Sequence, residues 1–308
     1  MYAPTGKHPG VTLLPLLCAK LFAPLAALGT TLGAVSALPA GPDLSAAQPK
    51  LVAMQPPSAL LTGRSPMHPA AGREFSGTPR LGALVWQKPD GTPGARLCSA
   101  AAVDSPSGDV IATAAHCVSG VTLGVRGPLS IAYVPEYAPG RAPYGVWYPT
   151  RITVPPQWAA SQDPDYDLAF VDVERPMSSV PLEQITGAER FAGPTVPAAG
   201  TLGVLLGYPY QVARPVACRA AIGHHSPRQL RFACANFPAG TSGGPLLTGV
   251  DPETGIGTLA GVIGGYRLGG DRDDVSYAAA LGPAMVALYQ TAVTAAPSPL
   301  LVNGVLQP

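Results

Sequence analysis

Short runs of apolar residues, separated by turn residues, dominate the chain from about residue 76 onward. Runs of this length, bounded by Gly, Pro and Ser, predict β-strands rather than helices. We expect strands at 81–87, 97–103, 110–113, 151–154, 168–173, 201–206, 216–222, 230–234, 245–248 and 258–265, and one or two more within 121–134. The segment 282–292 is helical in pattern, so the expected fold is all-β with a short C-terminal helix.

The composition supports this interpretation. The 308 residues include 37 prolines and 36 glycines, which favour short strands and many turns over long helices. Hydrophobic residues make up 47% of the chain, which is enough to build a core. Only 12% of the residues are charged and the formal net charge is +1, so the charge balance gives no argument for a nucleic-acid partner or an anionic membrane.

The first 75 residues differ from the rest. Lys7 and Lys20 precede a mostly apolar run at 21–38, and small residues at 35–37 and 38–40 offer two cleavage sites near its end, as in an export signal. We expect residues 1–37 to be this signal. An uncleaved membrane anchor is the alternative, which Pro24 weakens. Residues 38–75 are rich in Pro, Ala, Ser and Gln and predict a linker or a pro-segment.

Three motifs contain residues that could form a catalytic site. Ser242 lies between glycines in the run Gly-Thr-Ser-Gly-Gly-Pro, which on its own could be a simple turn between strands. His116 follows the apolar strand at 110–113, and Asp167 directly precedes the apolar strand at 168–173. A serine hydroxyl becomes a nucleophile when an imidazole takes its proton, and a buried carboxylate orients that imidazole. Asp163 and Asp165 compete for the carboxylate role, but only Asp167 adjoins the apolar run.

The order of these residues along the chain discriminates between folds. The pattern Gly-x-Ser-x-Gly at 240–244 also fits an α/β-hydrolase, in which the catalytic histidine follows the serine. No histidine follows Ser242 in this chain, so the α/β-hydrolase interpretation lacks a base. The order His116, Asp167, Ser242 is that of the chymotrypsin-type double barrel.

Together, Ala-Ala-His-Cys at 114–117, Asp-Tyr-Asp-Leu-Ala at 165–169 and the Ser242 motif resemble the trypsin/chymotrypsin-like serine peptidases. The resemblance extends from about residue 82 to 289 and is closest to the secreted bacterial branch that includes glutamyl endopeptidases. It implies a chymotrypsin-like double β-barrel in a peptidase domain at 76–292. The N-barrel would cover about 76–180 and the C-barrel about 195–292, and residues 293–308 would form a tail.

The resemblance also implies roles for individual residues. Ser242 would be the nucleophile, His116 the general base and then acid, and Asp167 the group that orients His116. The backbone N–H groups of Gly240 and Ser242 would form the oxyanion hole. Thr241 departs from the digestive members, which carry an aspartate there that pairs with a new N-terminal amine, so we expect no activation through that switch.

The resemblance also implies a specificity pocket. Asn236, Ile263 and Gly265 occupy positions that would line the pocket. Asn236 replaces the aspartate of Arg- and Lys-specific members, and Ile263 replaces the histidine of Glu-specific relatives. We expect a preference for neutral or small apolar side chains. His224, His225 and Arg228 could supply positive charge, but a solvated loop is the expected setting for these three residues.

Five cysteines add a prediction about covalent structure. Cys18 lies in the expected signal, and the other four can pair in three ways. We expect Cys98–Cys117 and Cys218–Cys234, because each bridge then closes a short loop within one half of the chain. A zinc site is the alternative, but no Cys-x-x-Cys spacing is present. No metal or organic cofactor is implied, and the acidic run at 271–274 is expected to be a solvated turn rather than a calcium site.

The sequence therefore predicts a secreted, extracellular serine endopeptidase. Its partner would be a polypeptide substrate, and we expect a monomer without stable membrane association once the signal is removed. An esterase would use the same residues. A catalytically silent double-barrel protein that binds a partner or serves at the cell surface is the alternative from a different class.

Overall fold

The computed structural model describes residues 70–125, 129–194 and 196–295, and the backbone of 301–302 and 305–306. The expected export signal at 1–37 and the expected linker up to residue 69 lie outside the described residues, so both stay predictions. Most of the expected tail at 293–308 also lies outside them.

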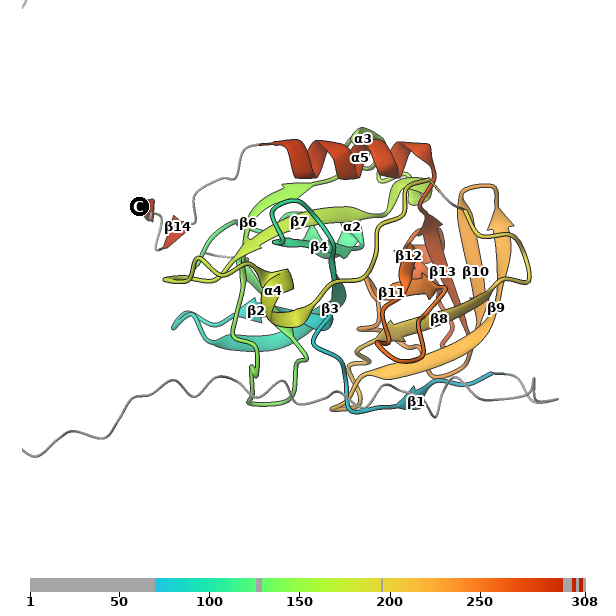
Figure 1. Cartoon of the computed structure of the whole chain (residues 1–308), viewed down its shortest axis with the longest axis horizontal. Coiled ribbons are helices and arrows are strands. Elements are labelled where there is room, and N and C mark those ends of the chain that lie inside the picture. Colours follow the sequence, from blue (N-terminus) through green and yellow to red (C-terminus); the bar gives the residue numbers. More distant parts are fainter. Residues whose placement is uncertain (1–69, 126–128, 195, 296–300, 303–304, 307–308) are drawn as a thin grey trace, which may run out of the picture. The chain divides into compact units, whose positions relative to one another are not determined.

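The first barrel contains six strands in the order β5-β2-β3-β4-β7-β6, all antiparallel. The two end strands approach each other at Tyr133 and Trp147, which exchange two backbone hydrogen bonds of 2.7 and 2.9 Å and so close the barrel. Figure 1 shows this barrel as the cyan-to-green half of the molecule. Its strands are β2 (Leu81–Gln87), β3 (Pro93–Val103), β4 (Val110–Thr113), β5 (Ile131–Pro135), β6 (Tyr148–Thr153) and β7 (Ala169–Glu174).

The second barrel is also antiparallel, in the order β9-β10-β13-β12-β11-β8, and β8 pairs with β9 to close it. An extra two-residue strand, β1, pairs with the first two residues of β9. The strands are β1 (Arg73–Glu74), β8 (Leu202–Gly207), β9 (Val216–Ser226), β10 (Gln229–Ala233), β11 (Pro245–Thr248), β12 (Thr258–Ile263) and β13 (Val275–Ala280). The expected all-β double barrel is confirmed.

Helices are few and short in the described chain. They are α2 (Ala115–Val118), α3 (Pro156–Ser161), the 3-10 turn η1 (Pro164–Tyr166), α4 (Leu182–Thr186), η2 (Tyr266–Gly269) and α5 (Pro283–Thr294). The C-terminal helix α5 is the one predicted from the sequence, and it lies across the first barrel (Figure 1). Tyr289 anchors it there, because its ring stacks on Phe191 and its hydroxyl donates to Asp104 O at 2.7 Å. The short strands β14 (Leu301–Val302) and β15 (Val305–Leu306) pair with each other.

One large apolar cluster fills the first barrel and continues into the second through residues such as Tyr208, Leu247 and Val262. A smaller cluster, which includes Phe232, Phe237 and Ile263, fills the rest of the second barrel. The barrels therefore share packed apolar contacts where they meet, which positions residues from both halves relative to one another.

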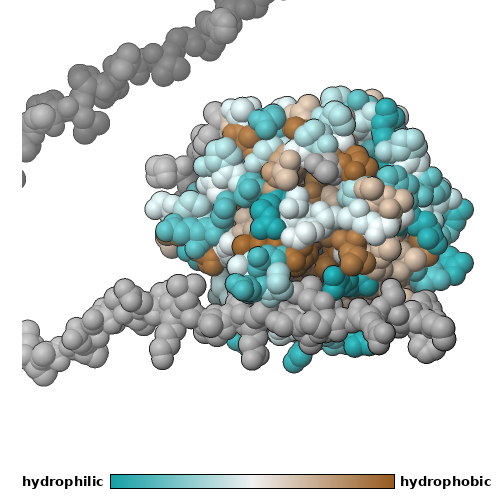
Figure 2. All heavy atoms as spheres, turned by 45° about the vertical axis from the view of Figure 1, so that its right-hand side comes forward, coloured by the Kyte–Doolittle hydropathy of each residue, from teal (hydrophilic) through white to brown (hydrophobic). Residues whose placement is uncertain are grey.

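The large hydrophobic side chains left exposed among the described residues are scattered. Figure 2 shows brown areas separated by hydrophilic ones on the face it presents. None of the described helices has both the length and the apolar character needed to cross a membrane. The exposed hydrophobic residues are Leu123, Leu129, Met177, Val180, Leu202, Tyr210 and Leu268.

Candidate active site

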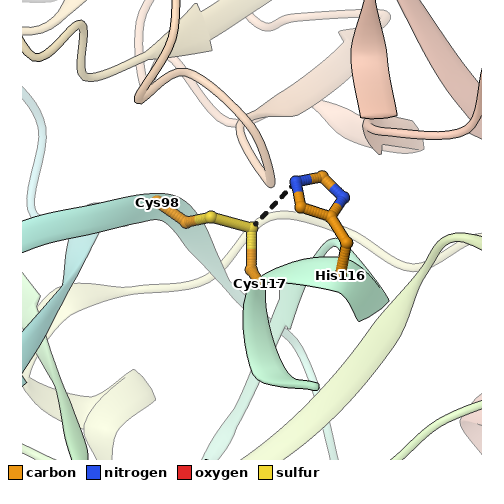
Figure 3. A group of neighbouring side chains, drawn as sticks. All are labelled: Cys98, His116 and Cys117. Carbon is orange, nitrogen blue, oxygen red and sulfur yellow. Dashed lines mark hydrogen bonds between the residues drawn. A yellow bond between two sulfur atoms is a disulfide. The ribbon is translucent and has the colours of Figure 1, made fainter. Parts of the chain in front are cut away.

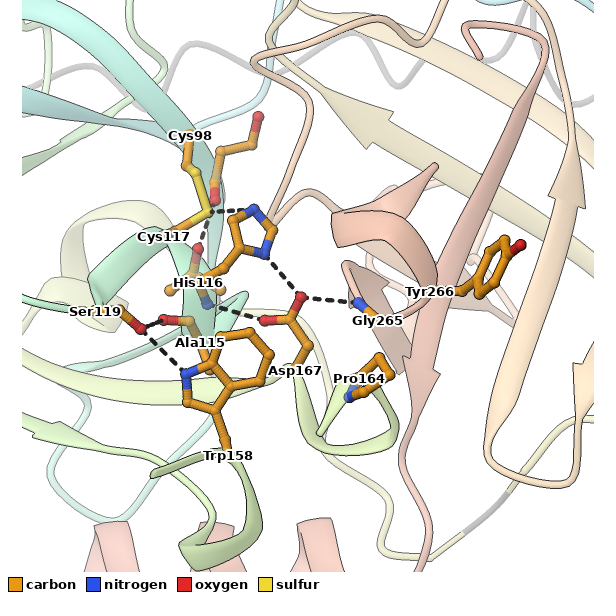
Figure 4. A network of polar contacts seen from close by, with 12 residues as sticks. Cys98, Ala115, His116, Cys117, Ser119, Trp158, Pro164, Asp167, Gly265 and Tyr266 are labelled. Atoms are coloured by element: carbon orange, nitrogen blue, oxygen red, sulfur yellow. Dashed lines mark hydrogen bonds and ion pairs between the residues drawn. A yellow bond between two sulfur atoms is a disulfide. The ribbon is translucent and has the colours of Figure 1, made fainter. Parts of the chain in front are cut away.

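His116 lies in the one-turn helix α2, directly after strand β4. The disulfide Cys98–Cys117 ties this helix to β3, as the sequence predicted. At its far end Ser119 Oγ donates to Ala115 O at 2.9 Å and accepts from Trp158 Nε1 at 3.1 Å (Figure 4). The short helix is therefore held at both ends, which fixes the backbone that carries the imidazole.

Asp167 lies between η1 and β7, and it is fully buried. Its Oδ2 accepts from His116 Nδ1 at 2.7 Å and from Gly265 N at 2.8 Å, and its Oδ1 accepts from His116 N at 2.9 Å (Figure 4). A buried carboxylate without such donors would be strongly destabilised. Three N–H donors therefore explain how this charge is accommodated at the boundary between the barrels.

This contact also determines which imidazole nitrogen is free. An ionised carboxylate only accepts hydrogen bonds, so Nδ1 carries the proton and Nε2 has the free lone pair. Nε2 lies 3.6 Å from Cys117 Sγ, a sulfur of the disulfide. The other two candidate carboxylates do not reach the imidazole: Asp163 accepts from Asp165 N, and Asp165 accepts from Gln229 Nε2.

Ser242 lies in the loop between β10 and β11, and its backbone conformation depends on the glycine after it. Gly243 has φ of +77°, and a Cβ there would lie 2.2 Å from Ser99 O and from Thr113 Oγ1. Only glycine fits both the conformation and the space. The loop thus lies close against β3 and β4, and Ser242 is half-buried with no hydrogen bond from its hydroxyl to any described residue.

The carbonyl groups of this loop point away from the cavity, toward donors in the protein. Ala239 O accepts from Tyr210 N at 3.0 Å, Thr241 O from Gly244 N at 2.9 Å, and Ser242 O from Ser99 N at 2.7 Å. In a trans peptide the N–H points opposite to the C=O. Among the described residues, neither Gly240 N nor Ser242 N donates to an acceptor, which leaves both available to bind a negatively charged oxygen.

His116 and Ser242 line the same cavity of about 850 Å³. Ile263 lines this cavity. Asn236 does not; its side chain donates to Gly72 O at 3.1 Å beside an adjoining hollow of about 680 Å³, which shares Pro238 and Asp273 with this cavity. Gly265 contributes its N–H to Asp167, a contact that the sequence did not suggest because any residue type carries a backbone N–H.

Charged residues surround the outer part of the cavity. Arg267 pairs with Asp271 and Arg272 with Asp274, so each arginine already has a carboxylate partner. The deeper lining includes Phe237 and Ile263, which are both almost fully buried. The described cavity therefore combines an apolar interior with a rim of ion pairs.

The three residues considered as a source of positive charge do not line this cavity. His224 Nε2 lies 2.7 Å from Pro197 O, and His225 contacts the rings of Tyr266 and Tyr277. Arg228 lies over the ring of Tyr166.

Cys98, His116 and Cys117 form a group whose ligand atoms lie close enough together for a metal ion (Figure 3). The two sulfurs are joined in a disulfide, however, and thiolates are what bind zinc. This group does not fit a metal site. The second expected bridge, Cys218–Cys234, is also present.

The antiparallel double barrel matches the chymotrypsin-like fold. No protein-family model and no curated protein sequence matches the chain. Among solved structures, it is similar to the protease Anisep from Arthrobacter nicotinovorans, with a TM-score of 0.60 and 23% identity over 73% of this chain and 100% of that one.

Two further solved structures have the same fold. The thermostable serine protease AL20 from an extremophilic microorganism gives a TM-score of 0.59 and 22% identity, covering 71% of this chain and 99% of that one. A Glu endopeptidase gives a TM-score of 0.53 and 14% identity, covering 73% of this chain and 97% of that one. At these identities the likeness establishes the fold.

Proposed function

We propose that the protein is a serine endopeptidase that cleaves peptide bonds through an acyl-enzyme. The observation that carries this proposal is the buried Asp167 in contact with His116 Nδ1, with Ser242 lining the same cavity as the imidazole. Nucleophile, base and orienting carboxylate are the three groups that this chemistry needs. The fold shared with solved serine proteases supports the same conclusion.

In the proposed mechanism Ser242 Oγ attacks the scissile carbonyl carbon while its proton passes to His116 Nε2. The resulting oxyanion accepts hydrogen bonds from the N–H groups of Gly240 and Ser242. Collapse of this intermediate breaks the C–N bond, and the imidazolium gives its proton to the leaving amine. A water molecule, deprotonated by His116, then hydrolyses the ester and regenerates the serine. Asp167 stays ionised and stabilises the imidazolium in both steps.

The expected substrate is a polypeptide with a neutral side chain before the cleaved bond. The apolar interior formed by Phe237 and Ile263 supports this preference. The arginines at the rim already pair with aspartates, which argues against their acting as a site for a glutamate side chain. One of the solved structures of this fold is a Glu endopeptidase, but the residues that line this cavity favour a neutral side chain over glutamate.

We further propose that the protein acts outside the cell. Disulfides persist in oxidising compartments and are rare in reducing ones, and this chain has one bridge in each barrel. The export signal expected at 1–37 agrees with this location.

The contact between Asp167 and His116 provides the test. Asp167→Asn is expected to reduce kcat on a peptide substrate by about four orders of magnitude, because the amide favours the wrong imidazole tautomer. The matched control is Asp165→Asn, whose Oδ1 still accepts from Gln229 Nε2 and which lies outside the imidazole contact. The control is expected to keep nearly full turnover. Equal turnover in both variants would contradict the proposed role of Asp167.

A further inference from the structure

Ser99, the residue after Cys98 in β3, contacts the loop at 234–244 between β10 and β11 of the other barrel, which carries the proposed nucleophile Ser242 and is named the nucleophile loop. It is fully buried. Its N–H donates to Ser242 O at 2.7 Å, and its hydroxyl lies 3.0 Å from Gly240 O and 2.8 Å from Tyr208 N. One side chain therefore connects the first barrel to two segments of the second.

The direction of the hydroxyl proton follows from these contacts. Tyr208 N is a donor, so Ser99 Oγ accepts that hydrogen bond. Gly240 O is an acceptor, so Ser99 donates its own proton to it. Both the donor and an acceptor site of the hydroxyl are used within the protein, which gives this contact a single orientation.

The loop needs such a contact because of its glycine. Gly240 has φ of +98°, and a Cβ there would lie 2.6 Å from Tyr208 O, so no other residue fits. The same absence of a side chain lets the peptide planes on either side of Gly240 rotate easily. Tyr210 N holds the plane before Gly240 through Ala239 O, and Ser99 holds the plane after it through Gly240 O.

Thr241 does not supply this contact. Its side chain is buried, but its hydroxyl donates to Pro238 O at 2.8 Å, a carbonyl of the same loop. The bond stiffens the loop internally without attaching it to the rest of the protein.

Neighbouring residues of β3 reinforce the attachment. Arg96 Nη2 donates to Tyr210 O at 2.9 Å and to Val212 O at 2.8 Å, and the Tyr210 hydroxyl donates to Leu97 O. Tyr210, whose N–H holds Ala239 O, is therefore itself bound to β3. Both peptide planes around Gly240 depend on this one strand.

We propose that Ser99 is a positioning residue: its hydroxyl holds the Gly240–Thr241 peptide, which lies between the two peptides that carry the Gly240 and Ser242 N–H groups, and so keeps both oxyanion-binding donors in their productive orientation. This inference rests on the proposed peptidase function. The Ser99 hydroxyl does not touch the substrate; it acts through Gly240 O, whereas Ser242 O is held by the Ser99 backbone N–H, which Ser99→Ala keeps. The nucleophile loop carries Thr241 and no aspartate, so it has no charged side chain with which to anchor itself. The hydroxyl of Ser99, from the first barrel, makes the anchoring hydrogen bond instead.

The test is Ser99→Ala, with kcat expressed per active site titrated by a fluorophosphonate so that unfolded protein does not enter the value. We expect kcat to fall about 10- to 100-fold with KM unchanged, because losing a whole oxyanion donor costs about 100- to 1,000-fold. The affinity for a peptide aldehyde, whose adduct oxygen occupies the oxyanion site, should fall by a similar factor.

The matched control is Thr186→Val, which removes another buried hydroxyl from a helix outside the cavity. The Thr186 hydroxyl lies 3.0 Å from Leu182 O and 2.8 Å from Gly187 O. It should lower stability but leave kcat and aldehyde affinity unchanged. A Ser99→Ala protein with wild-type kcat and aldehyde affinity would overturn the inference, as would a loss confined to KM.

If Ser99→Ala yields no folded protein, Ser99→Thr takes its place. It keeps the hydroxyl and should keep kcat within about 10-fold of the wild type; a loss of 100-fold or more would overturn the inference. A failure of the proposed function would look different, because the wild-type protein itself would then neither hydrolyse peptides nor react with the fluorophosphonate.

Discussion

At the scale of single residues, the buried ion pair of Arg80 and Glu189 joins the start of the first barrel to the segment between the barrels. Arg80 Nε donates to Glu189 Oε1 at 3.0 Å, and Gly257 N donates to Oε2 at 2.7 Å. Burial raises the pKa of the Glu189 carboxyl, and the Arg80 guanidinium opposes only part of that effect. No local sequence pattern predicts this pair, because its two members lie far apart in the chain.

Removing the arginine should leave an uncompensated buried charge. Arg80→Met is expected to lower the free energy of unfolding by about 3–5 kcal/mol at neutral pH. The pKa of Glu189 would rise further, and stability is then lost as the pH rises from the unfolded-state value of about 4.3 through the folded-state value. The deficit should therefore shrink as the pH falls toward 4. Urea unfolding at pH 7 and pH 4 measures both effects.

Arg272→Met is the matched control, because Arg272 pairs with Asp274 in solvent. Exposed pairs contribute little to stability. We expect no measurable change for this variant at either pH. An Arg80→Met deficit that is the same at both pH values would show that lost packing, rather than the uncompensated carboxylate, causes it.

At the scale of elements, strands with strong apolar patterns were predicted well and those with weak patterns were missed. β11 (Pro245–Thr248) was predicted to the residue, and α5 within two residues. β13 (Val275–Ala280) was not predicted, because its Ala-rich sequence carries little strand propensity and its place between β10 and β12 determines its conformation. β1 (Arg73–Glu74) was missed because it pairs with β9 far along the chain.

In the candidate site, too, local sequence patterns predict some of the groups and long-range contacts determine the others. The motifs predicted His116, Asp167 and Ser242, since side-chain type identifies each of them. The donors around them, Gly265 N and the Ser99 hydroxyl, depend on which segments fold together. No sequence window contains both members of such a contact.

The segment that carries β1 allows a prediction about where the folded unit begins. Residues 70–75 precede the domain boundary expected at 76, yet they bond to the second barrel through Gly72 N to Ala235 O, Ala235 N to Ala70 O and Phe75 N to Pro215 O. A protein beginning at residue 76 should be less stable than one beginning at 70 by about 2–4 kcal/mol, at roughly 1 kcal/mol per hydrogen bond.

The shorter protein should also have a higher KM, because the loop at 235–238 that these bonds hold leads into the cavity at Phe237 and Pro238. Urea unfolding and steady-state kinetics on the two proteins measure both effects. If the two proteins have equal stability and equal KM, residues 70–75 are dispensable to the fold, and the boundary expected from the sequence at 76 is the better one.

At the scale of the whole described domain, the candidate site is assembled from both barrels. The first barrel supplies His116 and Asp167, and the second supplies Ser242 and the loop that carries it. The apolar cluster that continues from one barrel into the other gives these residues a common support. A site of this kind exists only when both barrels are folded and docked, so its reactivity reports on the complete domain.

Labelling with a fluorophosphonate, which reacts with activated serines, shows whether Ser242 is an activated nucleophile. The wild-type protein, Ser242→Ala and Ser161→Ala should be compared after circular dichroism has shown that each is folded. Ser161 is the control, because its exposed hydroxyl donates only to Gln157 O on α3. We predict that the wild type and Ser161→Ala label equally and that Ser242→Ala does not label. A folded wild-type protein that fails to label, or a Ser242→Ala protein that labels like the wild type, would show that Ser242 is not an activated nucleophile.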